Sequence, residues 1–330
     1  MEALSFFDYA IKDMGGKKTM KFLEEMKKHI PYEEIEKLLI QENIYKPKTK
    51  NKRGRPPYPV KVLLGALFLQ AWYGLSDPMT EEMIHDRISF RRFLNIKGDD
   101  DIPDETTICK FRNELMKKML FDKIFNMVKE TMIKNNLILK EGSLVDATLI
   151  HSSEPTKKRN EKGEVISNKA ADPDATYTSK RGKKYHGFKM HIATDTNGMI
   201  KEVVTTTAKE SDIKQLDNLT KEEKKFVFAD SGYMSKENKK KLREKGIFNG
   251  IIERRVRGQK KLRKKQQKNN KNFSKVRAIV ELPFAFIKKV MNYRETRFIG
   301  LEKNDQYHLL LAAAYNIRRI PNLQKKLKIA

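Results

Sequence analysis

The sequence predicts a chain in two parts, an all-helical N-terminal part followed by an α/β part that is built on a mixed sheet. Apolar residues recur at helical spacing up to about residue 135, most densely from Val60 to Leu75. After Gly142 the apolar residues alternate or form short β-rich runs, and Asn197-Gly198 supplies a hairpin turn. At 330 residues the chain is long enough to bury a sizeable core in one large or two medium domains.

The helical part is predicted to contain three segments. Residues 1–45 form a helical arm, residues 46–59 an extended basic linker, and residues 60–140 a compact helical domain. Within this domain, Asp104 and the acids around it are typical of a helix start. The domain is either a helix-turn-helix that reads bases or a scaffold, because periodicity does not distinguish the two. The linker is similarly either a solvated tether or a basic arm that contacts phosphates.

The α/β part is predicted to begin with a strand from Ser143 to Ile150, which a long loop from His151 to Lys184 follows. Two strands, Tyr185 to Ala193 and Met199 to Thr206, then pair through the Asn-Gly turn. A helix, a buried strand, a second helix, a short strand and a last helix complete this part. They are expected at Ser211–Leu219, Lys225–Ala229, Ser235–Lys245, Asn249–Ile252 and Ser274–Met291.

This order of elements matches a ribonuclease-H-like domain with a mixed five-stranded sheet. In that order the first and fourth strands lie side by side at the centre of the sheet, as a right-handed crossover allows. The domain is predicted to span residues 141–320, with a basic loop at 254–275, and a basic tail follows at 321–330. The predicted fold class is therefore α/β for this domain and α+β for the whole chain.

The charge balance indicates a polyanionic partner. Seventy Lys and Arg against 43 Asp and Glu leave a formal net charge of +27, which makes nucleic acid the leading candidate. A membrane partner is disfavoured, since neither a basic amphipathic helix nor a spanning segment is evident, and the N-terminal residues have no export signal. The single Cys109 excludes an intramolecular disulfide and a cysteine-based zinc cluster, as expected for a cytoplasmic protein.

Two aspartates stand where a carboxylate is costly unless a cation compensates it. Asp146 lies within the apolar run Leu144-Val145-Asp146-Ala147-Thr148, and Asp230 directly follows the run Phe226-Val227-Phe228-Ala229. Ligands gather at the carboxyl ends of strands in open α/β sheets, so Asp230 is well placed for a site. Two such acids side by side would raise one another's pKa unless a metal ion neutralised them.

A third acid, Glu281, is expected on the last helix, where helical spacing puts Arg277 and Lys288 on the same polar face. Glu281 either pairs with Arg277 on the surface or joins the two aspartates, and Pro283 can kink or restart the helix at this point. Three carboxylates suit Mg²⁺ or Mn²⁺. Two such ions about 4 Å apart would activate a water or a 3′-hydroxyl and stabilise the departing oxygen.

With these residues in view, the chain resembles the DDE transposases of the insertion-sequence-five family. The resemblance spans roughly residues 60–320 and depends on several motifs in the family's order. In the helical domain the motifs are Gln70–Pro78, Arg91–Phe93 and Pro103–Ile108. In the α/β domain they are Val145–Thr148, Gly187–His191, Ala229–Tyr233, Val280–Glu281 with Pro283, Phe284 and Lys288, and Tyr293–Asn304. Residues 1–45 and the linker match none of these motifs.

The resemblance implies a DNA transposase that binds the terminal inverted repeats of a mobile element, cleaves there with water, and transfers the 3′ ends to target DNA. It implies a ribonuclease-H-like fold, with Asp146, Asp230 and Glu281 as catalytic residues and as ligands of two Mg²⁺ (or Mn²⁺) ions per active site. The expected partners are double-stranded DNA and a second copy of the chain, because two ends must be held together. The expected location is the cytoplasm of a bacterial or archaeal cell, on the nucleoid.

Further residues are predicted to bind DNA, each with a structural alternative. Lys288 and Arg277 would hold the scissile or a neighbouring phosphate, or else balance charge. Lys189 and His191 share one face of their strand, although His191 is also typical of a structural histidine. Tyr233 would stack on DNA or pack beside its turn. The basic loop is either solvated or follows the DNA backbone through Arg254, Arg255, Arg257, Lys260, Lys261 and Arg263.

Two other functions share these features. A nuclease with the same fold would hydrolyse DNA without joining it, and a regulator that kept the fold would bind DNA without cutting it. The complete set of acids counts against the regulator. An assay for joined products separates a transposase from the nuclease.

Overall fold

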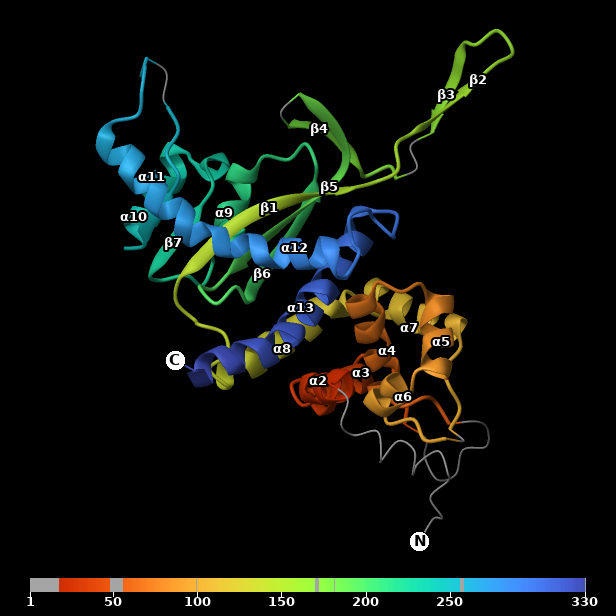
Figure 1. The fold of residues 1–330 in the computed structure, drawn as a ribbon. Helices are drawn as coiled ribbons and strands as arrows, with labels where there is room; N and C mark the ends of the chain where they lie inside the picture. Colours follow the sequence, from red (N-terminus) through yellow and green to blue (C-terminus); the bar gives the residue numbers. More distant parts are fainter. Residues whose placement is uncertain are drawn as a thin grey trace. The chain divides into compact units, whose positions relative to one another are not determined.

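The computed structural model describes residues 18–47, 56–98, 100–169, 172–180, 182–255 and 258–329 (Figure 1). Contacts divide the chain into two units. The helical unit comprises residues 1–137 together with 313–330, and the sheet unit comprises residues 138–312. None of the helices in these described ranges is long and apolar enough to cross a membrane.

The helical unit is built around one helix that is buried on nearly all sides. This helix, Val60–Tyr73 (α4), starts directly after Pro59 and ends at Gly74, which adopts the left-handed conformation that suits glycine. Such all-round burial needs several covering helices. The others are Lys18–Lys27 (α2), Tyr32–Gln41 (α3), Asp77–Asp86 (α5), Ile88–Leu94 (α6), Glu105–Lys117 (α7), Leu120–Lys134 (α8) and the C-terminal part of Leu301–Ile329 (α13).

Several expectations for the helical unit can be compared with the structure. The helix start at Asp104 is confirmed, because its carboxylate accepts a hydrogen bond from the Thr107 N–H at 2.6 Å and caps α7. The segment expected to be an arm contains α2 and α3, and α2 packs on α6 while α3 packs on α4 and α8. Most of the basic linker lies outside the described residues. The segment expected to be a basic tail continues α13 to Ile329, with Pro321 inside the helix.

The sheet unit contains the predicted mixed sheet. Strand Ser143–His151 (β1) pairs antiparallel with Lys183–Thr194 (β5) and parallel with Phe226–Ala229 (β7), which pairs parallel with Phe248–Ile251 (β8). On its other edge, β5 pairs with Thr176–Lys180 (β4) and then with Ile200–Thr207 (β6). The order β6-β5-β1-β7-β8 is that of a ribonuclease-H-like fold, so the predicted fold class and the central β1–β7 pair are confirmed. The sheet has six strands rather than the predicted five, because β4 also pairs with β5.

Helices cover both faces of the sheet. On one face, Leu216–Leu219 (α9) and Lys236–Glu244 (α10) enclose a core with Val145 from β1. On the other face, Lys264–Arg277 (α11) packs on β1 and β7, and the 3-10 turn Ala278–Val280 that follows it packs on β1 and β5. Because side chains alternate along a strand, Asp146 points to the face opposite to Val145, which is the face of α11.

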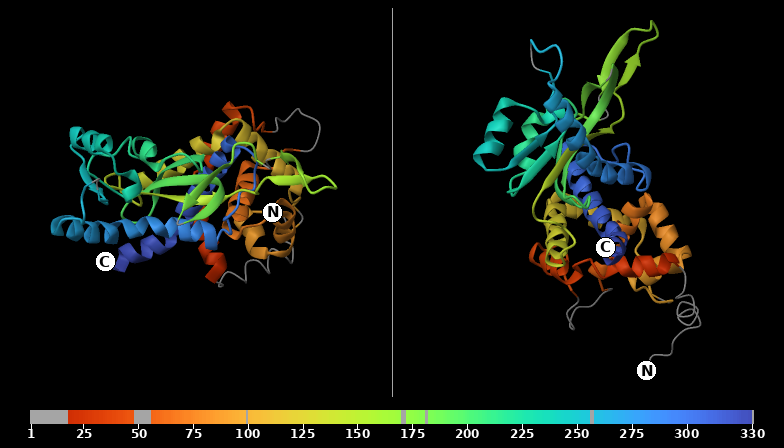
Figure 2. Two further views of the ribbon diagram at one scale, coloured as in Figure 1. Left: turned by 90° about the horizontal axis from the view of Figure 1, so that it is seen from above. Right: turned by 60° about the vertical axis from the view of Figure 1, so that its left-hand side comes forward.

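Three expectations for the sheet unit are wrong. The segment expected to be a long loop, residues 151–184, holds three strands, since Thr156–Arg159 (β2) and Val165–Lys169 (β3) form a separate hairpin and β4 joins the main sheet. Figure 2 shows the β2–β3 hairpin projecting away from that sheet. The basic loop expected at 254–275 is helical from Lys264, and the last predicted helix is divided into α11, the 3-10 turn and Glu281–Lys289 (α12). The helix α11 buries none of its residues, so no apolar periodicity marks it.

Gly187 is required by the close approach of β5 to β1. Its φ is +147°, and a Cβ atom there would lie 2.1 Å from the backbone oxygen of Ile150. We therefore expect Gly187→Ala to lower the free energy of unfolding by about 3 kcal/mol or more, because backbone atoms must move. Gly198→Ala is the matched control in the β5–β6 turn. Its nearest contact would be 3.4 Å, and we expect it to cost about 1 kcal/mol. Urea denaturation measures both, and equal losses would contradict the steric argument.

Candidate active site

The two aspartates lie side by side because β1 and β7 are parallel neighbours. Val145 of β1 is in register with Ala229 of β7, so the residues that follow them, Asp146 and Asp230, occupy the same level of the sheet. The strand β7 ends at Ala229, while β1 continues past Asp146 and pairs with β5. This is the carboxyl end of the central parallel pair, where open α/β sheets place their ligands.

Each aspartate is held by a backbone N–H of the residue that follows it. Asp146 accepts from the Ala147 N–H at 2.8 Å, and Asp230 accepts from the Ser231 N–H at 2.5 Å and caps the 3-10 turn Ser231–Tyr233. One carboxylate oxygen of Asp146 is thereby engaged with the backbone, and its other oxygen points to α11. The local geometry orients both acids before any ligand binds.

Arg277 connects Asp146 to the third acid. It is the last residue of α11, and its guanidinium donates to Asp146 Oδ2 at 2.5 Å and to Glu281 Oε1 at 3.2 Å. Glu281 begins α12 after the 3-10 turn, and 63% of its side chain is exposed, against 16% for Arg277. The surface pair between Arg277 and Glu281 is therefore present, and the same arginine also links Glu281 to Asp146.

The charges of the other two acids act on Asp146. Burial raises the pKa of Asp146, the Arg277 guanidinium and the Ala147 N–H oppose this shift, and the charges of Asp230 and Glu281 raise the pKa further. A cation beside Asp146 therefore relieves both the burial and the like-charge repulsion. In the structure that cation is Arg277.

The donor set fits a hard divalent cation. Carboxylate oxygens are the ligands that Mg²⁺ and Mn²⁺ take. Burial and the charges of Asp230 and Glu281 disfavour the ionised form of Asp146, and a cation beside it compensates that effect. Within the described residues, however, no group of three or more His, Cys, Asp or Glu side chains is arranged to hold a metal ion. Two of the three acids, Asp146 and Glu281, are paired with Arg277 instead.

A buried polar pair lies on the Val145 face of the sheet, opposite to the face of Asp146. His191 is fully buried, with Nδ1 3.3 Å from the Tyr233 hydroxyl and Nε2 2.9 Å from Thr206 Oγ1. Burial lowers the pKa of His191 to about 4, so the ring is neutral at pH 7. Burial raises the pKa of Tyr233, and the carboxylates of Asp212, Asp146 and Asp230 raise it further. Both side chains are inside the protein, as the structural alternatives for His191 and Tyr233 expected, and a contact of either with DNA stays a prediction.

Lys189 is also engaged within the protein. Its ammonium donates to Asp212 Oδ1 at 2.8 Å and to the Glu210 carbonyl at 2.7 Å, and 15% of its side chain is exposed. A direct phosphate contact by Lys189 would have to break this pair. Asp212 has no distinctive signal in the sequence, because an acid near the start of a predicted helix is typical of a cap. Its position is close to the Asp230 turn, since a Cβ on Gly232 would lie 3.4 Å from Asp212 Oδ2.

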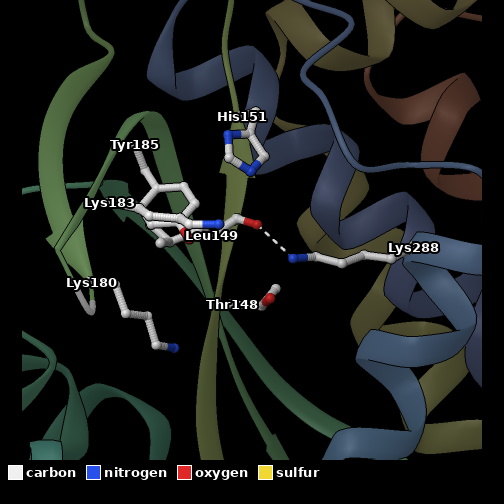
Figure 3. A pocket seen from close by; sticks show the side chains of 7 residues that line it. All are labelled: Thr148, Leu149, His151, Lys180, Lys183, Tyr185 and Lys288. Atoms are coloured by element: carbon white, nitrogen blue, oxygen red, sulfur yellow. Dashed lines mark hydrogen bonds between the residues drawn. The ribbon is translucent and has the colours of Figure 1, made fainter.

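Lys288 lies beside β1 rather than on the outer surface of α12. It donates to the Leu149 carbonyl at 2.7 Å, and burial lowers its pKa, as do the charges of Lys180 and Arg294. Figure 3 shows Lys288 in the wall of a pocket of about 480 Å³. The other residues that line the pocket are Thr148, Leu149, His151, Lys180, Lys183 and Tyr185.

The basic segment before and at the start of α11 is exposed. Among the residues predicted to bind DNA, Arg254, Arg255, Lys260, Lys261 and Arg263 all have exposed side chains, and Arg257 lies outside the described residues. Arg255 donates to the Lys260 carbonyl at 3.3 Å, which closes this segment on itself.

Comparison with known protein families gives two matches. Residues 139–317 match the family described as "Transposase DDE domain", and residues 13–114 match "Transposase domain (DUF772)". Among solved structures, the piggyBac transposase synaptic complex with hairpin DNA is 11% identical, with 96% of this chain and 75% of that chain covered and a TM-score of 0.46. The Mos1 strand transfer complex is 9% identical, with 79% and 86% covered and a TM-score of 0.20. Neither of these likenesses is close enough to support an inference about this chain.

The first family match covers the sheet unit and more than half of the chain, and Asp146, Asp230 and Glu281 all lie within it. The second covers most of the helical unit, so both units match transposase families. The chain therefore belongs to the family of transposases that have a DDE domain.

Proposed function

We propose that this protein is a DNA transposase of the insertion-sequence-five family, which cleaves at the terminal inverted repeats of a mobile element and joins the 3′ ends to target DNA. The observation that carries the proposal is the position of Asp146 and Asp230 side by side at the carboxyl end of the β1–β7 pair, with Arg277 linking Asp146 to Glu281. A net charge of +27 supports a polyanionic substrate.

The three acids are proposed to hold divalent metal ions. When bound, two Mg²⁺ or Mn²⁺ ions would supply activation of a water or a 3′-hydroxyl and stabilisation of the leaving oxygen. Asp146 and Asp230 are already oriented by the N–H groups of Ala147 and Ser231, so they need little rearrangement. Glu281, which is mostly exposed, would complete the set from α12.

Arg277 is proposed to change partners when DNA arrives. In the structure it compensates Asp146 and Glu281, and its guanidinium has the fork geometry that binds a phosphate through two N–H groups. Once the acids hold a metal ion, Arg277 would be released to bind the scissile or a neighbouring phosphate. Lys288, on the next helix, would bind a phosphate on the same side of β1.

Wider contacts are proposed for the rest of the chain. The exposed cations from Arg254 to Arg263 would follow the DNA backbone, which gives affinity without sequence preference. The partners would be double-stranded DNA, both element ends and target, and a second copy of the chain that holds the second end. A cytoplasmic location on the nucleoid fits this substrate.

An assay for joined products tests the proposal against its two competitors. Short inverted repeats in the DNA that flanks the coding region would define the element ends, and oligonucleotides with these ends already cleaved are incubated with the protein, plasmid target and Mg²⁺. We expect products in which the end is covalently joined to the plasmid. Hydrolysis without joined products would identify a nuclease, and binding that is inert with both Mg²⁺ and Mn²⁺ would identify a regulator.

A further inference from the structure

The pocket beside Lys288 gathers cations from three separate elements. Lys180 ends β4, Lys183 begins β5, and Lys288 lies on α12, while Tyr185 and His151 complete the wall from β5 and β1. Figure 3 shows Lys180 and Lys288 on opposite sides of the β1 residues Thr148 and Leu149. None of the residues that line the pocket is acidic.

The register of the β4–β5 pair places its two lysines together. Lys180 is directly opposite Lys183 across the antiparallel ladder, so their side chains share one face. Tyr185 follows two residues later on the same face, and its ring lies 5.3 Å from that of His151. Lys184, between them, faces the other way and does not line the pocket. The strand pairing therefore selects these two lysines and excludes their neighbour.

The cations of the pocket are not neutralised by the protein. Within the described part of the chain, neither Lys180 nor Lys183 forms an ion pair with a carboxylate, and both are exposed. Like charges facing one another are destabilising, and the charge of Lys180 contributes to the lowered pKa of Lys288. An anion in the cavity would therefore meet three ammonium groups and no carboxylate among the lining residues.

The pocket lies close to the proposed catalytic acids along both β1 and α12. Thr148 is two residues beyond Asp146 on β1, which corresponds to about 7 Å along a strand. Lys288 is two helical turns beyond Glu281 on α12, which corresponds to about 10 Å along a helix. A DNA strand whose reacting phosphate is at the acids therefore passes this pocket with a neighbouring phosphate.

We propose that Lys180 and Lys183, together with Lys288, bind a backbone phosphodiester of the DNA strand next to the reacting one, in the pocket between the β4–β5 pair and α12. This proposal rests on the proposed function and adds to it a binding site on strands where the sequence predicted a loop. Because the contact is made to phosphate, it contributes affinity and register for the strand but no base preference. The hydroxyl of Tyr185 supplies a further hydrogen-bond donor in the same wall.

The first test measures binding of the full-length protein to a 30-base-pair duplex of arbitrary sequence as a function of salt. The double variant Lys180→Gln/Lys183→Gln is compared with the control Lys184→Gln. This control also removes a positive charge, but from the opposite face of β5. Each neutralised phosphate contributes about 0.9 to the slope of log affinity against log salt. We expect the double variant to lose about one unit of slope and about tenfold in affinity, and Lys184→Gln to retain the wild-type slope. An unchanged slope in the double variant would overturn the proposal.

The second test reads the site directly. Free protein, protein with the duplex, and protein with inorganic phosphate alone are treated with an amine-acetylating reagent, and modification is measured by mass spectrometry. We expect the duplex to protect Lys180 and Lys183 and to leave Lys184 reactive, while inorganic phosphate gives little protection. Equal protection by millimolar phosphate would assign the pocket to free anions and overturn the DNA assignment.

The two proposals fail separately in these experiments. Asp230→Asn protein should show the same protection of Lys180 and Lys183, because the pocket does not depend on metal binding. Protection without any joined product would remove the transposase proposal and leave the pocket as a DNA contact. Joined products without protection of Lys180 and Lys183 would remove the pocket proposal and leave the transposase proposal standing.

Discussion

Asp230→Asn is expected to abolish cleavage and joining while DNA binding stays within about twofold of wild type. Asparagine can still accept the Ser231 N–H and cap the following turn, so the local fold is retained. The change removes one negative charge and one carboxylate oxygen from the proposed metal site. Hard divalent cations require such oxygen ligands. We expect a loss of about a thousandfold or more in the cleavage rate, which corresponds to about 4 kcal/mol in the activation free energy. Single-turnover cleavage in Mg²⁺ measures it.

The matched control is Asp217→Asn, which makes the same change at an acid that pairs with Lys241 on the surface of α9. Its cleavage rate should stay near the wild-type value. A cleavage rate in Asp230→Asn that is within tenfold of wild type would exclude Asp230 as a metal ligand, whatever its effect on stability.

Arg277→Gln is expected to have two effects with opposite dependence on metal. Without divalent ions, Asp146 loses its compensating cation, and we expect the free energy of unfolding at pH 7 to fall by about 2 kcal/mol, since a half-compensated buried charge is costly. Saturating Mg²⁺ should restore most of this loss, because the ion replaces the guanidinium. In the presence of Mg²⁺ the cleavage rate should still fall by about a hundredfold, because one phosphate ligand is missing.

The pH dependence of the Arg277→Gln variant has a definite sign. Burial already raises the pKa of Asp146, and removal of the guanidinium that opposes this shift raises it further. An acid whose folded pKa lies above its unfolded pKa stabilises the fold least when it is ionised, so the stability is lost as pH rises through the folded pKa. The metal-free variant should therefore lose more stability, relative to wild type, at pH 7 than at pH 4. Arg255→Gln, at an exposed site, serves as the control, and equal losses at both pH values would contradict the role of Arg277.

The order of the core strands and the two aspartates could be predicted because both leave a strong local signal. A carboxylate within an apolar run, as at Asp146, or directly after one, as at Asp230, is conspicuous because burial makes an uncompensated charge costly. The parallel pairing of β1 and β7 then follows from the order of elements, and it places these acids at one level. The segment around Glu281 gives a weaker signal for a metal ligand, since the spacing of Glu281 from Arg277 is equally typical of a surface helix.

The parts that could not be predicted have no buried apolar face. Hydrophobic periodicity reports which residues face a core, so α11, which buries none of its side chains, and β4, which adds to the edge of the sheet, leave little trace in the sequence. Both elements matter for the site. The helix α11 carries Arg277 to Asp146, and β4 carries Lys180 to the pocket.

The sequence by itself determined the ribonuclease-H-like order of strands, and it supplied the three acids as a prediction, because both depend on local patterns in the chain. Only the tertiary structure decided which side chains are available to a ligand. His191 and Tyr233 are enclosed by residues from distant strands and turns, whereas Lys180 and Lys183 are brought to Lys288 by strand pairing. Availability depends on burial and on long-range contacts, and neither can be read from the spacing of residues along one strand or helix.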